Sequence, residues 1–203
     1  MRTLALACVL SIAAPLSAAD LLGIAVRLGY ERPTDSYDLV TDTGAGESSQ
    51  HAHWDSLDRF VVEALFGRTW LVYGVGGVYQ ESEDETAGIT SELTRVGGRV
   101  MAGGSLPLGR WFRLELLPFA GLGNASYEIN QALVDNDDDS DPYFEWGADL
   151  DLVLRVPGLM EMGLGVGWLA SEAEFENTLA GVPIRSRIEE AGVLGRVFAG
   201  VHF

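Results

Sequence analysis

The sequence contains no lysine and only one cysteine, Cys8. All 13 basic residues are therefore arginines, and 30 acidic residues outnumber them to give a formal net charge of -17. Such an acidic chain repels nucleic acid, which argues against a nucleic-acid-binding role. Because Cys8 lies in the N-terminal segment described next, the rest of the chain has no disulfide, no thiol nucleophile and no cysteine-based metal site.

The N-terminal segment, residues 1–19, has the three regions of a signal peptide. Arg2 supplies the positive charge, residues 4–16 form an apolar stretch, and residues 17–19 are small. The apolar stretch is too short to be a transmembrane helix, which needs about 20 residues. We predict export and cleavage after Ala19, and removal of Arg2 then changes the net charge from -17 to -18.

Beyond residue 19, the sequence lacks any apolar run long enough for a membrane-spanning helix. The longest uncharged stretches, residues 69–80 and 116–127, contain 12 residues each. A spanning helix needs about 20 residues, whereas a tilted spanning strand needs only about 9 to 11. Any passage of this part of the chain across a bilayer must therefore use strands.

The chain does have an alternation of period two. Apolar residues occupy every second position in 22–30, 144–156, 160–170 and 191–203, and charged residues or glycines fill most positions between them. Successive side chains of a strand point to opposite faces, so each segment predicts a strand with one apolar face.

Four further segments alternate less regularly, at 59–66, 70–79, 95–102 and 112–122. In the last of them, Pro118 cannot donate to a strand ladder, so we expect a β-bulge there. Together with the first four segments, they predict eight strands.

The connections between these strands alternate in length. The short ones are 67–68, 105–110 and 157–158, and the long ones are 33–53, 81–91, 128–142 and 171–186. Outer-membrane barrels have short periplasmic turns and longer extracellular loops. The sequence therefore predicts an all-β fold over residues 20–203, an eight-stranded antiparallel up-and-down transmembrane β-barrel.

The polar faces of the strands carry nearly balanced charge. They hold seven arginines and eight carboxylates: Arg27, Arg59, Arg95, Arg99, Arg113, Arg155 and Arg196 with Glu31, Glu63, Glu115, Glu145, Asp149, Asp151, Glu161 and Glu190. An unpaired buried charge is costly, so the balance favours a narrow lumen in which these groups pair. Eight strands leave room only for side chains, including Leu117 and Phe198. A narrow channel is the alternative for the lumen, and a soluble lipocalin-like barrel is the rival fold.

Aromatic residues fall near both predicted ends of the strands. We expect an outer girdle of Tyr30, Trp54, Tyr79, Tyr127, Phe144, Trp146 and Trp168, and an inner girdle of Phe66, Trp70, Phe112 and Phe203. Amphipathic rings are favoured where a membrane meets water.

Two groups of polar residues are candidates for chemistry. His51 and His53 lie near serines and Asp55, which are the parts of a nucleophilic triad, and this leaves a lipid A-modifying enzyme as an alternative function. The required geometry is not visible in the sequence, and no His-x-Ser motif occurs. We therefore predict no catalytic residue and no cofactor.

The acidic run 135–141 places carboxylates at alternate positions, as calcium or magnesium sites do. It departs from the EF-hand pattern, because Ser140 replaces the loop glycine and Trp146 stands in place of the final glutamate. Acidic runs are usually solvated. We therefore predict no specific metal site, but expect the acidic loops to attract divalent cations that bridge to lipopolysaccharide.

The C-terminal segment 197–203 ends in Phe203 and has apolar residues at every second position. In this it resembles the terminal strand of outer-membrane proteins, and the whole of 20–203 resembles the OmpA/OmpX-type and surface-antigen barrels. The resemblance implies a bacterial outer-membrane location, outer-membrane lipid as a neighbour, recognition of Phe203 by the barrel-assembly machinery, and a monomer. It implies a structural or surface-interaction role, and we expect no OmpA-type peptidoglycan-binding domain after Phe203.

Overall fold

The computed structural model describes residues 23–34, 36–42, 44, 46–68, 70–86, 89–130, 134–135, 140–156, 160–179 and 182–203. The predicted signal peptide, residues 1–19, lies outside these ranges, so its cleavage after Ala19 stays a prediction. The strands are β1 (Ile24–Pro33), β2 (Ser36–Asp42), β3 (Glu47–His53), β4 (Ser56–Arg68), β5 (Leu71–Thr86), β6 (Ile89–Pro107), β7 (Phe112–Asn130), β8 (Val134–Asp135), β9 (Asp141–Val156), β10 (Met160–Leu179) and β11 (Val182–His202). Within the described ranges, the structure has no helical segment with the length and hydropathy that a membrane crossing requires.

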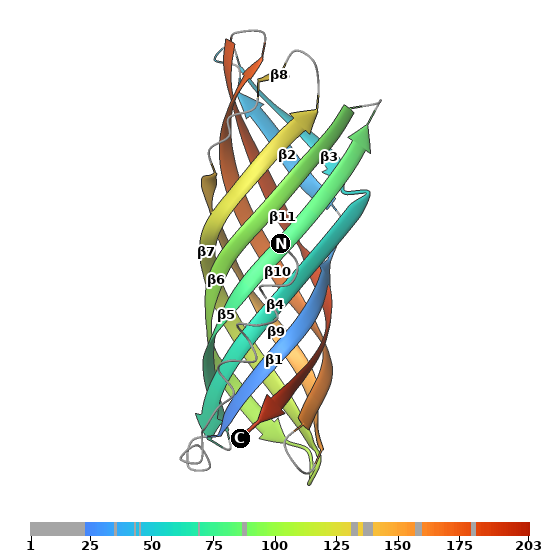
Figure 1. Ribbon diagram of the computed structural model, residues 1–203, viewed down its shortest axis with the longest axis vertical. Helices are drawn as coiled ribbons and strands as arrows, with labels where there is room; N and C mark the ends of the chain where they lie inside the picture. Colours follow the sequence, from blue (N-terminus) through green and yellow to red (C-terminus); the bar gives the residue numbers. More distant parts are fainter. Residues whose placement is uncertain are drawn as a thin grey trace.

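Eight of these strands close into one antiparallel barrel, which confirms the predicted fold. The order around the barrel is β1–β4–β5–β6–β7–β9–β10–β11, and β11 pairs back onto β1. Val26 on β1 and Met160 on β10 both pair with Val201, which shows β11 between the first and the penultimate barrel strand. Figure 1 shows a tall barrel of tilted strands, with the start of β1 and the C-terminus together at its lower end.

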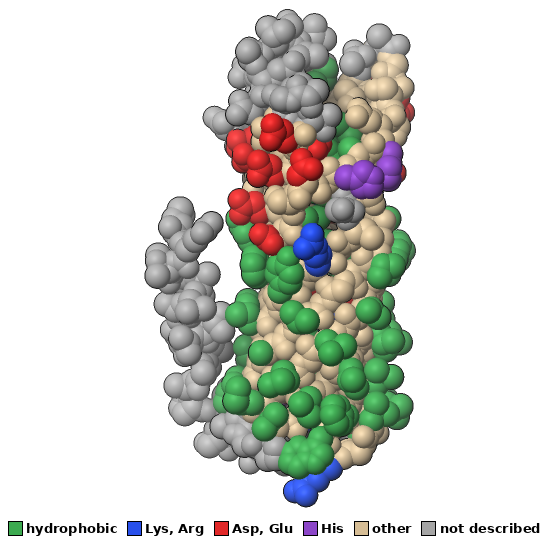
Figure 2. Space-filling model, turned by 90° about the vertical axis from the view of Figure 1, so that its right-hand side faces the viewer, with side chains coloured by type: hydrophobic (Ala, Val, Ile, Leu, Met, Phe, Trp, Pro, Cys, Tyr) green, Lys and Arg blue, Asp and Glu red, His purple; other side chains and the backbone are tan. Residues whose placement is uncertain are grey.

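In the lower part of the barrel, the apolar faces of the strands point outward. Leu152 and Val201 are 37% exposed and Val166 is 56% exposed, whereas Asp149 is only 2% exposed. Apolar side chains cover this part of the wall in Figure 2. A lipocalin-like barrel would have the opposite arrangement, with its apolar side chains inside.

Two of the long loops, 81–91 and 171–186, were predicted wrongly, because most of their residues continue the strands. β10 has 20 residues and β11 has 21, about twice the length that a tilted strand needs to span a bilayer. Strands β5 and β6 likewise extend through the predicted loop at 81–91. The first long connection forms the β2–β3 hairpin, whose strand β2 pairs with the upper part of β11.

The strands continue because the alternation continues with its polarity exchanged. In the upper part of the barrel, apolar side chains point inward and pack into one buried core, which we call the upper core: Tyr37, Trp54, Leu57, Leu93, Ala125, Tyr127, Tyr143, Ala173, Phe175 and Ile188. The neighbouring positions on β5 and β10, such as Glu83 and Glu174, are exposed. In a strand that runs through both parts, such as β10, the apolar face is therefore the outer face below and the inner face above.

Two smaller predictions were also wrong. No bulge occurs at Pro118: the pairs Met101–Phe119 and Gly104–Leu116 lie three residues apart on both strands, so no residue is inserted. Pro118 lies exposed on the outer face, and the β6–β7 ladder is only interrupted between those two pairs.

The outer aromatic girdle is smaller than predicted. Phe144, Trp146 and Trp168 do face outward at 51%, 51% and 38% exposure. Trp54 and Tyr127 instead lie in the upper core, because they fall in the region where the apolar face has turned inward.

Candidate functional site

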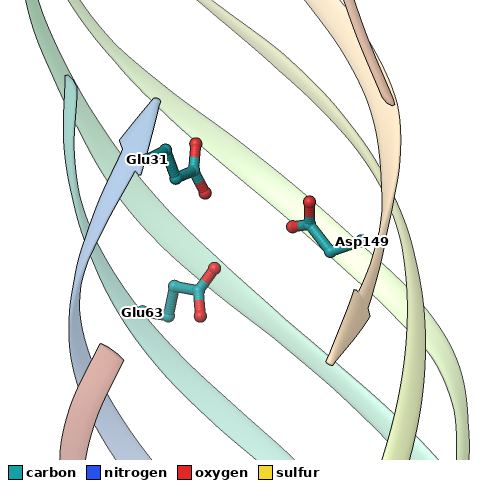
Figure 3. A group of neighbouring side chains, drawn as sticks. All are labelled: Glu31, Glu63 and Asp149. Atoms are coloured by element: carbon teal, nitrogen blue, oxygen red, sulfur yellow. The ribbon is translucent and has the colours of Figure 1, made fainter. Parts of the chain in front are cut away.

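The centre of the lumen holds three carboxylates that face one another. Glu31 on β1, Glu63 on β4 and Asp149 on β9 each have an oxygen within 4.8 Å of the others (Figure 3). A cation already faces all three: Nη2 of Arg99 contacts Glu63 and lies 2.7 Å from Glu31 Oε1 and 3.9 Å from Asp149 Oδ2. Arg196 adds a second guanidinium, which lies 2.9 Å from Glu63 and contacts Asp149. This central cluster is thus an ion-pair network in which arginine supplies the positive charge that a metal would bring.

The network continues toward both ends of the barrel. Above the central cluster, Arg59 joins Glu31 at 2.8 Å and Glu145 at 2.7 Å. Below it, Arg27 joins Glu115 at 2.8 Å and Glu161 at 2.5 Å. The pairs Arg59–Glu145 and Arg27–Glu115 join distant strands across the lumen, whereas Arg59 and Glu31 lie opposite each other on the neighbouring strands β4 and β1.

All fifteen charges predicted for the polar faces point into the lumen, and thirteen of them are buried. Arg113 and Arg155 are the partly exposed pair, with 18% and 32% exposed side chains. Leu117 is fully buried and Phe198 is 5% exposed, so apolar groups also fill the interior. The prediction of a lumen filled by paired charges is confirmed for the described residues.

The upper core closes around a stacked aromatic pair. The rings of Tyr37 and Trp54 lie 4.1 Å apart between centroids, at an interplanar angle of 16°. Trp54 Nε1 donates to Glu190 Oε1 at 2.8 Å, and the Tyr37 hydroxyl donates to Asp84 Oδ2 at 3.1 Å. Burial raises the pKa of the Tyr37 hydroxyl, so this group stays protonated and keeps its donor role. Tyr37 on β2 and Trp54, which lies between β3 and β4, thus connect the β2–β3 hairpin to Asp84 on β5 and Glu190 on β11.

The outer face of the upper strands is acidic. Glu83 on β5, Glu92 on β6 and Glu128 on β7 are exposed and lie directly opposite one another in the strand register. We call these three residues the acidic row. Acidic side chains gather above the apolar part of the wall in Figure 2. Like charges in directly opposite positions destabilise a sheet, so the acidic row is not explained by the stability of the barrel.

Acids on the opposite side of the upper barrel have cationic partners. Arg185 on β11 lies 2.9 Å from Glu176, and Arg187 lies 2.7 Å from Glu189 and 3.8 Å from Glu172. The described upper wall thus has one side where acids pair with arginine and another where they face each other.

The two histidines singled out in the sequence lie on β3, on the exposed outer face of the β2–β3 hairpin. His51 Nδ1 lies 2.8 Å from Asp38 Oδ1, and the ring centroids of His51 and His53 are 5.2 Å apart. Ser49 is the next residue on this face of β3, about 7 Å further along the strand. A histidine and a carboxylate are therefore brought together, but Ser49 does not complete a nucleophilic triad with them.

The acidic run at 135–141 is only partly described. Asp135 lies in β8, which pairs with the end of β10, and Asp141 begins β9. Residues 136–139 lie outside the described residues, so the expectation about divalent cations in this run stays a prediction.

The upper core was missed in the sequence. The sequence did contain evidence for it, because three apolar residues continue the alternation of predicted strands. Leu93 precedes the segment 95–102, Tyr127 follows 112–122, and Phe175 follows 160–170. The acidic residues between them were interpreted as loop residues, although a strand outside the membrane also carries polar residues on its outer face.

Comparisons with known proteins bear on the fold. Neither protein-family models nor curated proteins give a match. Among solved structures, the outer membrane protein OprG from Pseudomonas aeruginosa matches at a TM-score of 0.57 and 5% identity, over 90% of this chain and 96% of that one. Neisserial surface protein A matches at a TM-score of 0.44 and 11% identity, over 85% of this chain and 97% of that one. Ail from Yersinia pestis matches at a TM-score of 0.42 and 14% identity, over 90% of this chain and 99% of that one. This chain therefore shares the closed antiparallel β-barrel fold of OprG.

Proposed function

We propose that this protein is a bacterial outer-membrane barrel with a structural and surface-interaction role. In this proposal, residues 1–19 direct export, the lower barrel spans the outer membrane as a monomer, and the upper barrel stands outside the cell. The upper barrel presents the acidic row to partners, and the lumen does not conduct.

The observation that carries the proposal is the exchange of polarity along the strands. Outward residues are apolar in the lower barrel, as lipid contact requires, and acidic in the upper barrel, as water contact requires. The inward residues change in the opposite sense, from ion pairs to the upper core. A protein that lay entirely in water would gain nothing from an exposed apolar band of this kind.

The filled lumen supports a structural role over a channel. Arg99 and Arg196 cross the centre of the barrel, and the upper core lies above them. A conducting path would have to displace charges that are buried and paired, which is costly. Their arrangement is better suited to locking the eight strands together.

Several partners follow from this placement. The apolar band contacts outer-membrane lipid. The acidic row lies next to the headgroups, where divalent cations would bridge its carboxylates to lipopolysaccharide phosphates. The C-terminal Phe203 on the end of β11 would be read by the barrel-assembly machinery, as its resemblance to outer-membrane terminal strands implies.

Two measurements test the proposal. Cell fractionation with a gel that compares heated and unheated samples should find the protein in the outer membrane, with the folded form migrating differently from the heat-unfolded form. Purified barrel in planar bilayers should give no single-channel currents. Recovery in the soluble periplasmic fraction would contradict the membrane assignment, and regular conductance steps would contradict the closed lumen.

A further inference from the structure

We propose that His51 and His53 form a surface site for a divalent transition metal ion such as Zn²⁺, Ni²⁺ or Cu²⁺. This site is independent of the structural role proposed above, because the two histidines lie on the exposed outer face of the β2–β3 hairpin, away from the lumen. Strand register, ring geometry and the partner of His51 support this site.

Strand register brings the two imidazoles to the same side of the hairpin. His51 and His53 are two residues apart on β3, so their side chains share one face. Ala52 between them turns inward and packs against the upper core, which fixes the histidine face toward solvent. A two-residue spacing on a strand is one of the simplest ways to direct two imidazoles toward one ion.

The ring spacing fits one shared ion. The centroids of His51 and His53 lie 5.2 Å apart, and the ring planes are inclined by 84°. Two imidazoles that bind one tetrahedral ion at about 2.0 to 2.1 Å place their ring centres about 5 Å apart. This spacing is compatible with one ion that takes one nitrogen from each ring.

A carboxylate prepares one of the two rings for binding. Asp38 lies opposite His51 in the β2–β3 register, and its Oδ1 is 2.8 Å from His51 Nδ1. Metal-binding histidines usually hold a carboxylate or carbonyl oxygen with the nitrogen that does not bind the ion, which fixes the tautomer and the ring direction. Because Asp38 occupies Nδ1, Nε2 of His51 is the nitrogen that would bind the ion.

The donor set indicates the class of metal. Imidazole nitrogens suit zinc, copper and nickel, whereas calcium and magnesium prefer oxygen ligands. Two protein ligands leave the remaining positions open to water or to a ligand from another molecule. The site therefore differs in chemistry from the acidic row, which offers only carboxylate oxygens.

Refolded mature barrel in detergent micelles would test the site, with Co²⁺ as a spectroscopic probe and Zn²⁺ in calorimetric titration. We expect one ion per chain, visible as the absorption of tetrahedrally bound Co²⁺ and displaced by Zn²⁺. Excess Ca²⁺ and Mg²⁺ should not compete. His51→Ala and His53→Ala should each abolish this binding, and Asp38→Asn should weaken it by about 10- to 100-fold.

Two variants serve as matched controls. His202→Ala removes the other histidine of the mature chain, and Glu83→Gln with Glu92→Gln weakens the acidic row; both should leave Zn²⁺ affinity unchanged. All variants should keep the heat-modifiable form, since none of the changed residues belongs to the central cluster. Binding that survives the loss of both His51 and His53, or that needs only one of them, would overturn the shared site.

Discussion

The lower and upper halves of the barrel use the same strands in opposite ways. Below, Leu164 and Val197 face outward while Arg196 and Asp149 pair inside. Above, Phe175 lies inside the barrel while its neighbour Glu174 faces outward. The strand ladder runs through both halves without a break between β10 and β11. The continuous backbone ladder thus does not fix which face of a strand is apolar, and the exchange agrees with the proposed placement of the lower half in lipid and the upper half in water.

The largest expected effect comes from removing the central cation. Arg99→Met takes away the guanidinium that faces Glu31, Glu63 and Asp149, and leaves buried carboxylates without that partner. We expect the free energy of unfolding to fall by about 3–5 kcal/mol, as for other broken buried pairs. Urea titration followed by the heat-modifiability gel measures this loss.

The matched control for that variant is Arg185→Met. Arg185 forms an exposed pair with Glu176, so its loss should hardly change the urea midpoint. Equal destabilisation by both variants would show that the lumen pairs have no special role.

The next effect separates the two outer surfaces. Leu164 is 62% exposed on the lower wall, and Leu164→Arg should cost about 2–4 kcal/mol if this position lies near the bilayer midplane. Glu174→Arg, ten residues further along β10, should cost only about 0.2–1 kcal/mol, because the new arginine lies opposite Arg187. Unfolding in lipid vesicles provides the comparison. Similar values for both substitutions would remove the distinction between a lipid-facing and a water-facing wall.

A smaller effect probes the upper core alone. Trp54→Phe keeps the aromatic packing on Tyr37 but removes the bond from Nε1 to Glu190. Hydrogen bonds to charged groups contribute about 1.5–3 kcal/mol. Amide exchange should accelerate in β2 and β3, while the lower strands stay protected. Uniform acceleration through all eight barrel strands would instead mean that both halves unfold as one unit.

The smallest effect is a gain in stability. Glu92 faces Glu83 and Glu128 in the acidic row, so Glu92→Gln should stabilise the barrel by about 0.2–1 kcal/mol, and more at low ionic strength. Glu189→Gln is the control, because it removes the 2.7 Å pair with Arg187 and should not stabilise. Thermal unfolding at two salt concentrations would compare the variants, and destabilisation by Glu92→Gln would indicate that the row already has a bound cation.

The sequence predicted the lower half well and the upper half poorly. For the lower half, segments such as 144–156 combine strict alternation with charges on one face, and both the outward apolar face and the lumen pairing follow from that pattern. For the upper half, Glu81 and Glu83 were read as loop residues, because acidic side chains carry no information on whether the backbone is paired. Only the inward positions Leu93 and Phe175 marked these segments as strands.

The candidate sites were predictable to a lesser degree. Which arginine pairs with which carboxylate depends on how strands distant in sequence meet across the lumen, as Arg196 and Glu63 do. Period-two patterns say that a side chain points inward but not which side chain it meets there. The closeness of Asp38 to His51 likewise depends on the register of the β2–β3 hairpin, which alternation does not specify for polar strands.

The central cluster also constrains the order of assembly. Its members come from β1, β4, β6, β9 and β11, so the first and last strands must meet before Glu31 and Arg196 approach to 3.8 Å. A half-formed, open sheet in lipid would hold these ions without their counter-charges. We therefore expect membrane insertion and the pairing of β1 with β11 to occur together, stabilised by the ion pairs of the central cluster.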